Sequence, residues 1–166
     1  MDHPSDRQAL YETHADRIYR ICYLLMGNRS DAEDMLHNTF LKAFSRTQPF
    51  ENLAHEEGWL VITATNECRR SLKYWFHAKR TDLDVHDLPK KNTDTDDTLR
   101  ELMGLAPRHR QLLYLYYYEG YTTRELSDML HINESTLRSR LAKARKLLRL
   151  QLEEDDHEER ESDPSL

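Results

Sequence analysis

Apolar residues recur at helical spacing along most of the chain, and turn-forming residues separate the periodic stretches. In the first half, Gly27 and Pro49 mark two breaks, because glycine readily ends a helix and proline disfavours helix in the residue before it. Ser30 and Glu33 have the spacing of a capping box, which predicts a helix start at Ser30. The three amphipathic helices predicted here span residues 5–26, 30–48 and 57–79.

The second half of the chain carries helical signals on a shorter scale. Residues 99–105 and 107–118 predict two helices, the latter opened by a proline. Thr122 then precedes a short helix that ends near Leu130. A turn of three residues follows, and a long basic helix extends from Glu134 to about residue 152.

Between these halves the periodicity is lost over residues 81–97, which are rich in Asp, Asn, Thr and Lys. We therefore predict an all-α protein of two small helical domains joined by a flexible linker, the second containing a helix-turn-helix. The predicted parts are a first domain at 1–80, the linker at 81–97, the helix-turn-helix domain at 98–152 and an acidic disordered tail at 153–166.

The composition excludes several classes of protein. The chain has 166 residues with four glycines, which disfavours β-sandwiches and glycine-rich nucleotide-binding folds. Its longest uncharged run, residues 58–66, is far shorter than the roughly 20 residues of a membrane span. The polar N-terminus lacks the pattern of a signal peptide. We therefore expect a cytoplasmic protein with no membrane insertion.

Charge is distributed unevenly along the chain. Residues 151–166 hold eight acids and one base, a net charge of −7, so the remaining residues carry +1 of the total of −6. Within them, residues 69–80 and 134–149 each carry +5, whereas residues 1–67 carry −5. Two basic segments in an otherwise acidic chain indicate two contacts with a phosphate backbone, although each segment taken alone also fits a solvated helix face.

The helix-turn-helix predicts a surface that reads duplex DNA. Its two helices need an apolar seam, and the exposed start of the second helix must then offer hydrogen-bonding groups to base edges and phosphates. A plain amphipathic helix in a bundle is the alternative explanation for the same pattern. The expected contacts to DNA are Ser135, Thr136, Arg138, Ser139, Arg140, Lys143 and Arg145, with the last two placed for the backbone.

The third helix of the first half combines basic and aromatic side chains. Arg69, Arg70 and Lys73 accompany Trp59 and Trp75, a composition that suits unpaired nucleic acid because unstacked bases need aromatic faces. The two tryptophans fit a protein core at least as well. The three basic residues are therefore the expected contacts of this segment with melted DNA.

No catalytic constellation is visible in the sequence. The nine histidines lack metal-binding spacing, no Walker or nucleophile-elbow motif occurs, and Cys22 and Cys68 lie on apolar stripes. We predict no catalytic residue, no metal site and no cofactor. A small helical enzyme would lack both a nucleophile and a metal cluster.

Four stretches, in order and separated by the linker, resemble RNA polymerase sigma factors of the extracytoplasmic-function (ECF) type. The similarity covers roughly residues 8–80 and 98–150. The stretches that carry it are 31–34 with 39–44, 59–60 with 64–66 and 69–70, 112–115 with 118–121, and 134–141 with 144–145. Three features depart from the family pattern: His37-Asn38 replace its usual Gln-Glu, an acidic tail is added, and the loop of residues 49–57 is acidic through Glu51, Glu56 and Glu57. An acidic loop suits a pocket for an uncharged base and not a phosphate clamp.

The resemblance implies a protein that is not an enzyme, binds core RNA polymerase, directs it to promoters and helps to open the DNA. It implies contact of residues 31–44 with the β′ clamp helices, and a second contact with the β flap. The implied polymerase-binding residues are Asp31, Asp34, Met35, His37, Asn38, Phe40 and Leu41.

The resemblance also assigns the DNA contacts. The loop of residues 49–57 would capture a flipped base of the minus-ten element, and Asn66 would contribute to its selectivity. Residues 135–145 would enter the major groove of the minus-thirty-five element. An anti-sigma factor is a further expected partner, because many relatives are held inactive by one.

A stand-alone helix-turn-helix regulator is the alternative function. It would use the first half for dimerisation or sensing, which leaves the acidic helix at residue 31 and the basic-aromatic helix after it unexplained. The tail of −7 charge suggests a further hypothesis, that it weakens binding of DNA by the free protein.

Overall fold

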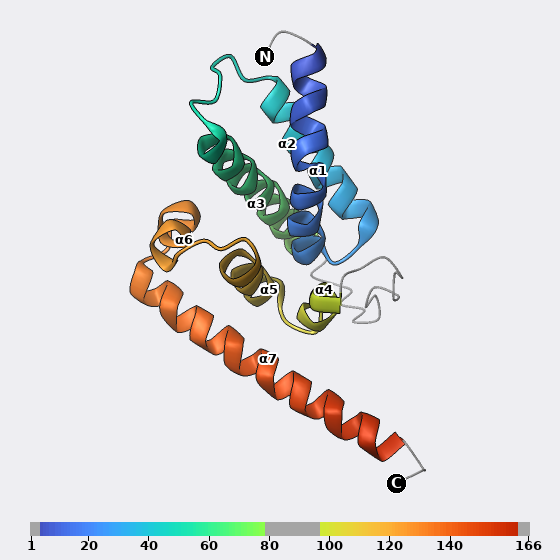
Figure 1. The fold of residues 1–166 in the computed structure, drawn as a ribbon. Coiled ribbons are helices and arrows are strands. Elements are labelled where there is room, and N and C mark those ends of the chain that lie inside the picture. The colour runs from blue at the N-terminus through green and yellow to red at the C-terminus, as the bar shows by residue number, and fades with distance from the viewer. Residues whose placement is uncertain (1–3, 79–96, 163–166) are drawn as a thin grey trace. The chain divides into compact units, whose positions relative to one another are not determined.

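The structure is a computed structural model that describes residues 4–78 and 97–162 (Figure 1). Within these residues every regular element is helical, which confirms the prediction of an all-α fold. The chain divides into two compact units between Asn92 and Thr93. No helix among the described residues combines the length and the apolar character needed to cross a bilayer.

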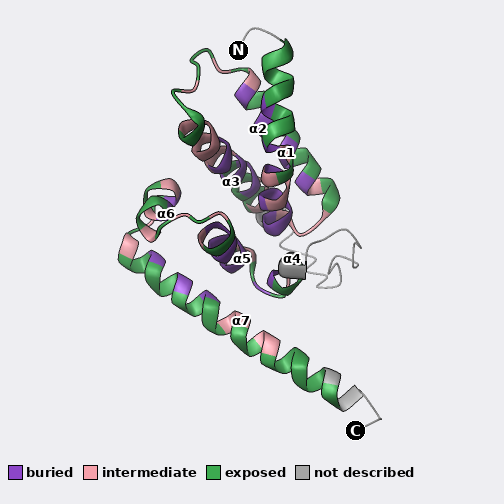
Figure 2. Ribbon diagram, viewed as in Figure 1, coloured by how far each residue is buried: buried purple, intermediate pink, exposed green. Residues whose placement is uncertain are grey.

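The first unit is a bundle of three helices, α1 (Pro4–Met26), α2 (Arg29–Phe44) and α3 (Leu53–Ala78), each in contact with the other two. Their apolar stripes meet in one core, where the buried positions of Figure 2 gather. Ile18 and Ile21 of α1, Phe40 of α2 and Leu60 of α3 are fully enclosed there. Burial of such side chains drives the packing that stabilises the three helices.

Two helices of the first unit begin earlier than predicted. The N-cap of α2 is Asn28, whose side chain accepts a hydrogen bond from the Asp31 backbone N–H at 2.9 Å, and not Ser30. Asn28 can take this position because Gly27 before it turns the chain with a φ of 80°. Helix α3 begins at Leu53 because Asn52 accepts the His55 N–H at 2.9 Å.

The second unit contains α4 (Asp97–Leu102), α5 (Pro107–Leu113), a π-helical turn η1 (Tyr114–Tyr118), α6 (Thr123–Leu130) and α7 (Glu134–Ser162). The predicted helix 107–118 therefore changes its hydrogen bonding at Tyr114, whose carbonyl accepts the Glu119 N–H at 3.1 Å. The capping box of Thr122 and Glu125 forms as predicted at the start of α6.

Helix α7 corrects one prediction about the C-terminus. We expect disorder from Glu153, but the helix continues to Ser162, and its acidic side chains at residues 153–158 are exposed (Figure 2). Glutamate is a good helix former, no glycine or proline intervenes before Pro164, and Arg149 pairs with Glu153 one turn away at 3.9 Å. The predicted linker lies outside the described residues, apart from Asp97, which begins α4.

Candidate nucleic-acid and polymerase interfaces

Helices α6 and α7 form a helix-turn-helix whose turn is held by its own hydrogen bonds. His131 ends α6 in the left-handed conformation with a φ of 53°. The Ser127 hydroxyl donates to the Ile132 carbonyl at 2.5 Å, and the Ile132 N–H donates to the Ser127 carbonyl at 3.1 Å. Leu126 of α6 and Leu137 of α7 are fully buried between the helices. The angle between the helices is thus set by a built turn and a closed apolar seam.

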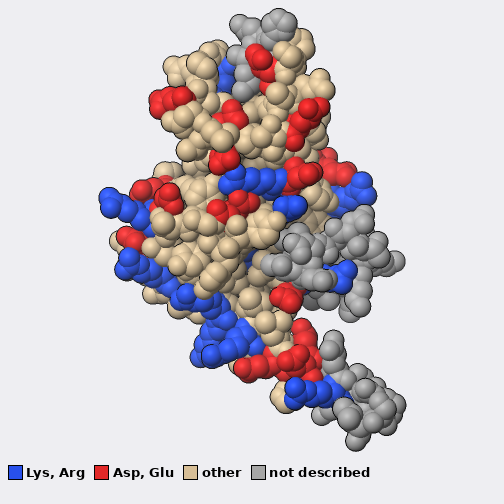
Figure 3. Space-filling model, in the orientation of Figure 1, with Lys and Arg blue, Asp and Glu red and all other residues tan. Residues whose placement is uncertain are grey.

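The polar side of α7 is the candidate surface for duplex DNA. Figure 3 shows basic side chains along the first part of α7 and acidic ones towards its C-terminal end. Glu134 pairs with Arg138 at 2.8 Å and also accepts the Thr123 hydroxyl at 3.0 Å, which links α7 to α6. The residues predicted to contact duplex DNA are all exposed: Ser135, Thr136, Arg138, Ser139, Arg140, Lys143 and Arg145.

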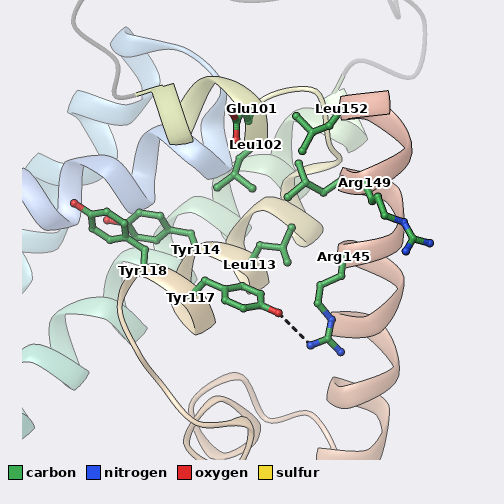
Figure 4. Close-up of a pocket in the computed structure, with 10 residues that line it drawn as sticks. Glu101, Leu102, Leu113, Tyr114, Tyr117, Tyr118, Arg145, Arg149 and Leu152 are labelled. Atoms are coloured by element: carbon green, nitrogen blue, oxygen red, sulfur yellow. Dashed lines mark hydrogen bonds between the residues drawn. The ribbon is translucent and has the colours of Figure 1, made fainter. Parts of the chain in front are cut away.

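Arg145, one of these seven residues, is hydrogen-bonded to another part of the second unit. Arg145 donates to the phenol oxygen of Tyr117 on the π-helical turn at 3.1 Å (Figure 4). This contact raises the pKa of the Arg145 guanidinium, which is positively charged in any case. The structure therefore joins Arg145 to the wall of a groove behind α7, which the sequence pattern alone does not reveal.

That groove is an apolar cavity of about 380 Å³ within the second unit. Tyr117 and Tyr118 at its edge are 58% and 48% exposed, and Leu152 lies at its far end on α7 (Figure 4). Gln151 Nε2 donates to the Glu101 carbonyl at 2.9 Å and ties α7 to α4 there. The groove is lined by Glu101, Leu102, Leu113, Tyr114, Tyr117, Tyr118, Arg145, Leu148, Arg149 and Leu152.

The residues predicted to bind melted DNA share one face of α3. Asn66, Arg69, Arg70 and Lys73 follow the helical repeat, and all four are exposed. Behind them Glu67 is buried and forms ion pairs with Lys42 of α2 and, at 3.3 Å, with Arg70. A buried acid thus orients part of the basic face while the face keeps its net positive charge. Sequence spacing did not indicate this role of Glu67.

The loop between α2 and α3 is closed by a cluster of aromatic rings around one cation. The Arg46 guanidinium carbon lies 4.5 Å from the Phe50 ring centroid and 4.8 Å from that of Trp59. The two rings are themselves 5.7 Å apart, and Phe50 meets the His55 ring edge-to-face at 5.6 Å. Trp59 is half-buried, and the side chains of Trp75 and Phe76 lie outside the described set.

Two contacts to α1 hold the start of α3. His14, which is buried, lies with Nε2 at 2.6 Å from the Glu56 carboxylate. Arg17 pairs with Glu57 at 3.2 Å. Glu56 and Glu57, two of the three acids of residues 49–57, are therefore paired with side chains of α1.

Helix α2 separates the predicted polymerase-binding residues into two groups. Asp34, His37, Asn38 and Leu41 form an exposed stripe at helical spacing. Met35 and Phe40 point inward instead, and the Phe40 ring lies 4.9 Å from that of Tyr11 in the bundle. Asp31, half-buried, is engaged by the Asn28 side chain at 2.7 Å. Met35 and Phe40 therefore support the helix and do not form its surface, which corrects our prediction for these two residues.

The described residues contain no group of three His, Cys, Asp or Glu side chains that could hold a metal ion. Cys22 and Cys68 are buried free thiols. The hydrogen bond with Cys22, together with burial, raises the pKa of the Cys68 thiol, so it stays protonated and unreactive.

Comparison with known proteins assigns each unit. Residues 10–75 match the model of sigma-70 region 2, and residues 96–148 match the model of sigma-70 region 4. The first match disfavours a stand-alone helix-turn-helix regulator, because it covers the half that such a protein would not need.

Solved structures share the fold. One is the sigma factor RpoE in complex with the anti-sigma factor NepR from Bartonella quintana, with a TM-score of 0.66 and 19% identity over 89% of this chain and 97% of that one. Another is CnrH in complex with the cytosolic domain of CnrY, with a TM-score of 0.63 and 16% identity over 93% and 92% of the two chains.

Curated relatives carry the family assignment. The ECF RNA polymerase sigma factor SigL of Mycobacterium tuberculosis is 30% identical over 159 residues, which cover 89% of each chain. SigE of Mycolicibacterium smegmatis is 32% identical over 152 residues, 84% of this chain but only 59% of SigE. The chain belongs to the ECF RNA polymerase sigma factors.

Proposed function

We propose that this sigma factor recognises promoters with two separate surfaces and docks on core polymerase with two others. The observation that carries the proposal is the two-sided character of α7, where Leu137, Leu141 and Ala144 are buried while every predicted contact to duplex DNA is exposed. Sigma factors as a family are not enzymes, and this role requires binding surfaces only.

The first DNA surface is the exposed start of α7, which enters the major groove of the minus-thirty-five element. Arg138 and Arg140 supply bidentate donors for guanine, and Ser135, Thr136 and Ser139 supply shorter hydrogen-bonding groups. Lys143 lies further along the helix and contacts the phosphate backbone. Arg145 contributes less, because Tyr117 holds it.

The second DNA surface is the exposed face of α3, which holds the melted strand of the minus-ten element. Asn66 contributes a side-chain amide that can both donate to and accept from a base edge. Arg69, Arg70 and Lys73 supply positive charge for the backbone of that strand. The Glu67 pairs support this role by ordering Arg70.

The polymerase contacts lie on α2 and in the groove of the second unit. The exposed stripe of Asp34, His37, Asn38 and Leu41 docks on the β′ clamp helices, with Leu41 as its apolar anchor. The apolar groove beside Tyr117 and Leu152 accepts a segment of the β flap, since a concave apolar cavity of this size suits a few buried side chains.

The remaining expectations follow from this assignment. The solved relatives RpoE and CnrH were captured with NepR and CnrY, and an anti-sigma factor is accordingly proposed as a partner of this chain. The protein would act in the cytoplasm, where bacterial polymerase meets DNA.

The proposal is tested by mixing the full chain with core RNA polymerase and following complex formation by gel filtration. The Asp34→Lys variant reverses a charge on the α2 stripe, and Asp16→Lys reverses an exposed charge on α1 as its matched control. Co-elution of the wild type and of Asp16→Lys, with loss of Asp34→Lys, is the expected result. Failure of the wild type to bind core polymerase would overturn the proposed function.

A further inference from the structure

We propose that Arg46 is a contact to the phosphodiester backbone of the unpaired DNA strand, held ready by two aromatic rings at the base of the α2–α3 loop. This inference rests on the proposed function of the first unit and adds a residue that the α3 face does not include. Arg46 lies two residues beyond the end of α2, so it belongs to the loop that leads to α3.

The first step of the argument is that the Arg46 side chain is ordered by rings and not by an acid. Its guanidinium carbon is within 5 Å of the centroids of Phe50 and Trp59, a distance at which the ring faces attract a cation. Among the described residues no carboxylate pairs with Arg46, and its buried Nε has no hydrogen-bond partner. Its five N–H donors therefore remain unused by the described part of the protein.

The second step concerns the acids of the same segment. By sequence the loop looks acidic, which argues against a phosphate contact. In the structure Glu56 faces His14 and Glu57 faces Arg17, so both carboxylates are engaged at α1. Within this segment Arg46 therefore contacts only the ring faces of Phe50 and Trp59, whereas Glu56 and Glu57 are paired with side chains of α1.

The third step is the chemistry of the ligand. A planar guanidinium with free donors suits a phosphate better than a neutral base, and holding it against two rings lowers the entropy lost on binding. Aromatic rings next to a cation are also the composition of single-strand binding surfaces, where bases stack and phosphates pair. The ligand class is therefore single-stranded DNA, bound through its backbone and without dependence on sequence at this contact.

The test measures how binding of single-stranded DNA depends on salt. The protein is used as the full chain in holoenzyme with core polymerase, and the probe is a fluorescent oligonucleotide pool of random sequence, alongside oligothymidylate. Arg46→Met and Arg46→Gln remove the charge. Arg7→Met is the matched control, because Arg7 also lies over a ring, that of Phe44 at 5.8 Å, but on α1.

Loss of one phosphate contact should lower the slope of log affinity against log salt by about 0.7. We expect this change in Arg46→Met and Arg46→Gln, with affinity about tenfold weaker for both probes, and an unchanged slope in Arg7→Met. Arg46→Lys should keep the slope and lose part of the affinity, since the charge stays but the planar stacking is lost. Circular dichroism melting identifies any variant that fails to fold, and the second charge-removing variant then decides.

Two outcomes overturn the inference, and a third contradicts the proposed function on which it rests. An unchanged slope in both charge-removing variants overturns it and leaves the proposed function intact. The sequences that the holoenzyme retains from the random pool are also compared between the variants and the wild type. A change in these sequences without a change in slope also overturns the inference, because Arg46 would then act only through the shape of the loop. Failure of the wild-type holoenzyme to bind either probe would instead contradict the proposed role of the first unit in holding melted DNA.

Discussion

Arg145 on α7 donates a hydrogen bond to the phenol oxygen of Tyr117 on the π-helical turn at 3.1 Å. The helix that carries the DNA-reading residues is thereby joined to the wall of the apolar groove. A residue that sequence spacing assigns to DNA is therefore engaged by the protein, although its side chain is exposed. Arg140, about one and a half turns earlier, is equally exposed and has no such hydrogen bond among the described residues.

This contact predicts unequal effects for two arginines of α7. Arg140→Ala should weaken binding of holoenzyme to upstream-element duplex DNA by about tenfold or more, because a bidentate base or phosphate contact is lost. Arg145→Ala should change it by less than about threefold, since the side chain is held at Tyr117. Fluorescence anisotropy on the duplex measures both. Equal losses would show that Arg145 leaves Tyr117 to bind DNA.

Alanine substitutions at the neighbouring residues Phe40 and Leu41 should have different effects: the first should lower stability and the second should weaken polymerase binding. Phe40 is 2% exposed and Leu41 is 49% exposed, although they are adjacent on α2. Phe40→Ala should lower the free energy of unfolding of the first unit by about 3–5 kcal/mol. Leu41→Ala should change it by less than about 0.5 kcal/mol and still weaken binding to core polymerase.

Urea titration gives the stabilities of these two variants, and gel filtration with core polymerase gives the binding. A Leu41→Ala protein that binds as the wild type does would remove Leu41 from the proposed interface.

The start of α2 gives a matched pair of capping variants. Asn28 accepts the Asp31 N–H, so Asn28→Ala should lower the free energy of unfolding by about 1 kcal/mol. Ser30→Ala is the control, because Ser30 is exposed and lies inside the helix. Chemical denaturation of both proteins checks this. If Ser30→Ala destabilised the protein more than Asn28→Ala, Ser30 and not Asn28 would be the N-cap, as the capping-box spacing in the sequence predicts.

The capping box of α6 predicts a pH dependence. The Thr122 backbone N–H and then the Thr122 side chain hold the pKa of Glu125 below its ordinary value of 4.5. A lowered pKa in the folded state means that ionised Glu125 stabilises the fold above pH 4.5, and that this contribution is lost as the pH falls through the folded-state pKa.

Replacing Glu125 by Gln should therefore flatten the acid side of the stability profile of the second unit, followed by thermal melting from pH 3 to pH 6. Because Glu125 is exposed, we expect a small change in melting temperature. A profile identical to that of the wild type would contradict the assignment.

The helical C-terminus changes the expected effect of the acidic segment. Glu153 lies 15 residues after Arg138 on one helix, about 22 Å along its axis at about 1.5 Å per residue. This separation exceeds the Debye length of about 8 Å at physiological salt and is within that of about 30 Å at 0.01 M.

Removal of residues 153–166 should therefore strengthen DNA binding by the free protein at 0.01 M salt and leave it unchanged at 0.15 M. Anisotropy at the two salt concentrations measures this. A gain in DNA affinity that persists at 0.15 M salt would mean that the acidic side chains come close to the DNA-reading residues at the start of α7.

Much of the fold follows from local sequence signals. Helical periodicity depends on each residue and its neighbours three and four positions away, so the helices, the capping box at Thr122 and the turn at His131 were predictable. The exposed polar side of α7 was predictable for the same reason, because an apolar seam of leucines defines the opposite side.

Other features depended on contacts between segments far apart in sequence. The resemblance assigned Met35, Phe40 and Leu41 together to the polymerase contact, but packing against α1 and α3 buries the first two and leaves Leu41 exposed. The Arg46 cluster needs Trp59 from the next helix, and the Glu56 and Glu57 pairs need α1. The acidic segment is helical because the helix propensity of its glutamates outweighs the repulsion among their charges.

The sequence by itself thus determined the helices, their order and the chemistry of their exposed faces, since these depend on short-range spacing. Only the tertiary structure decided which side chains remain available to a partner. That depends on burial and on ion pairs between helices: Glu67 with Arg70 and Lys42, Tyr117 with Arg145, and the rings that hold Arg46.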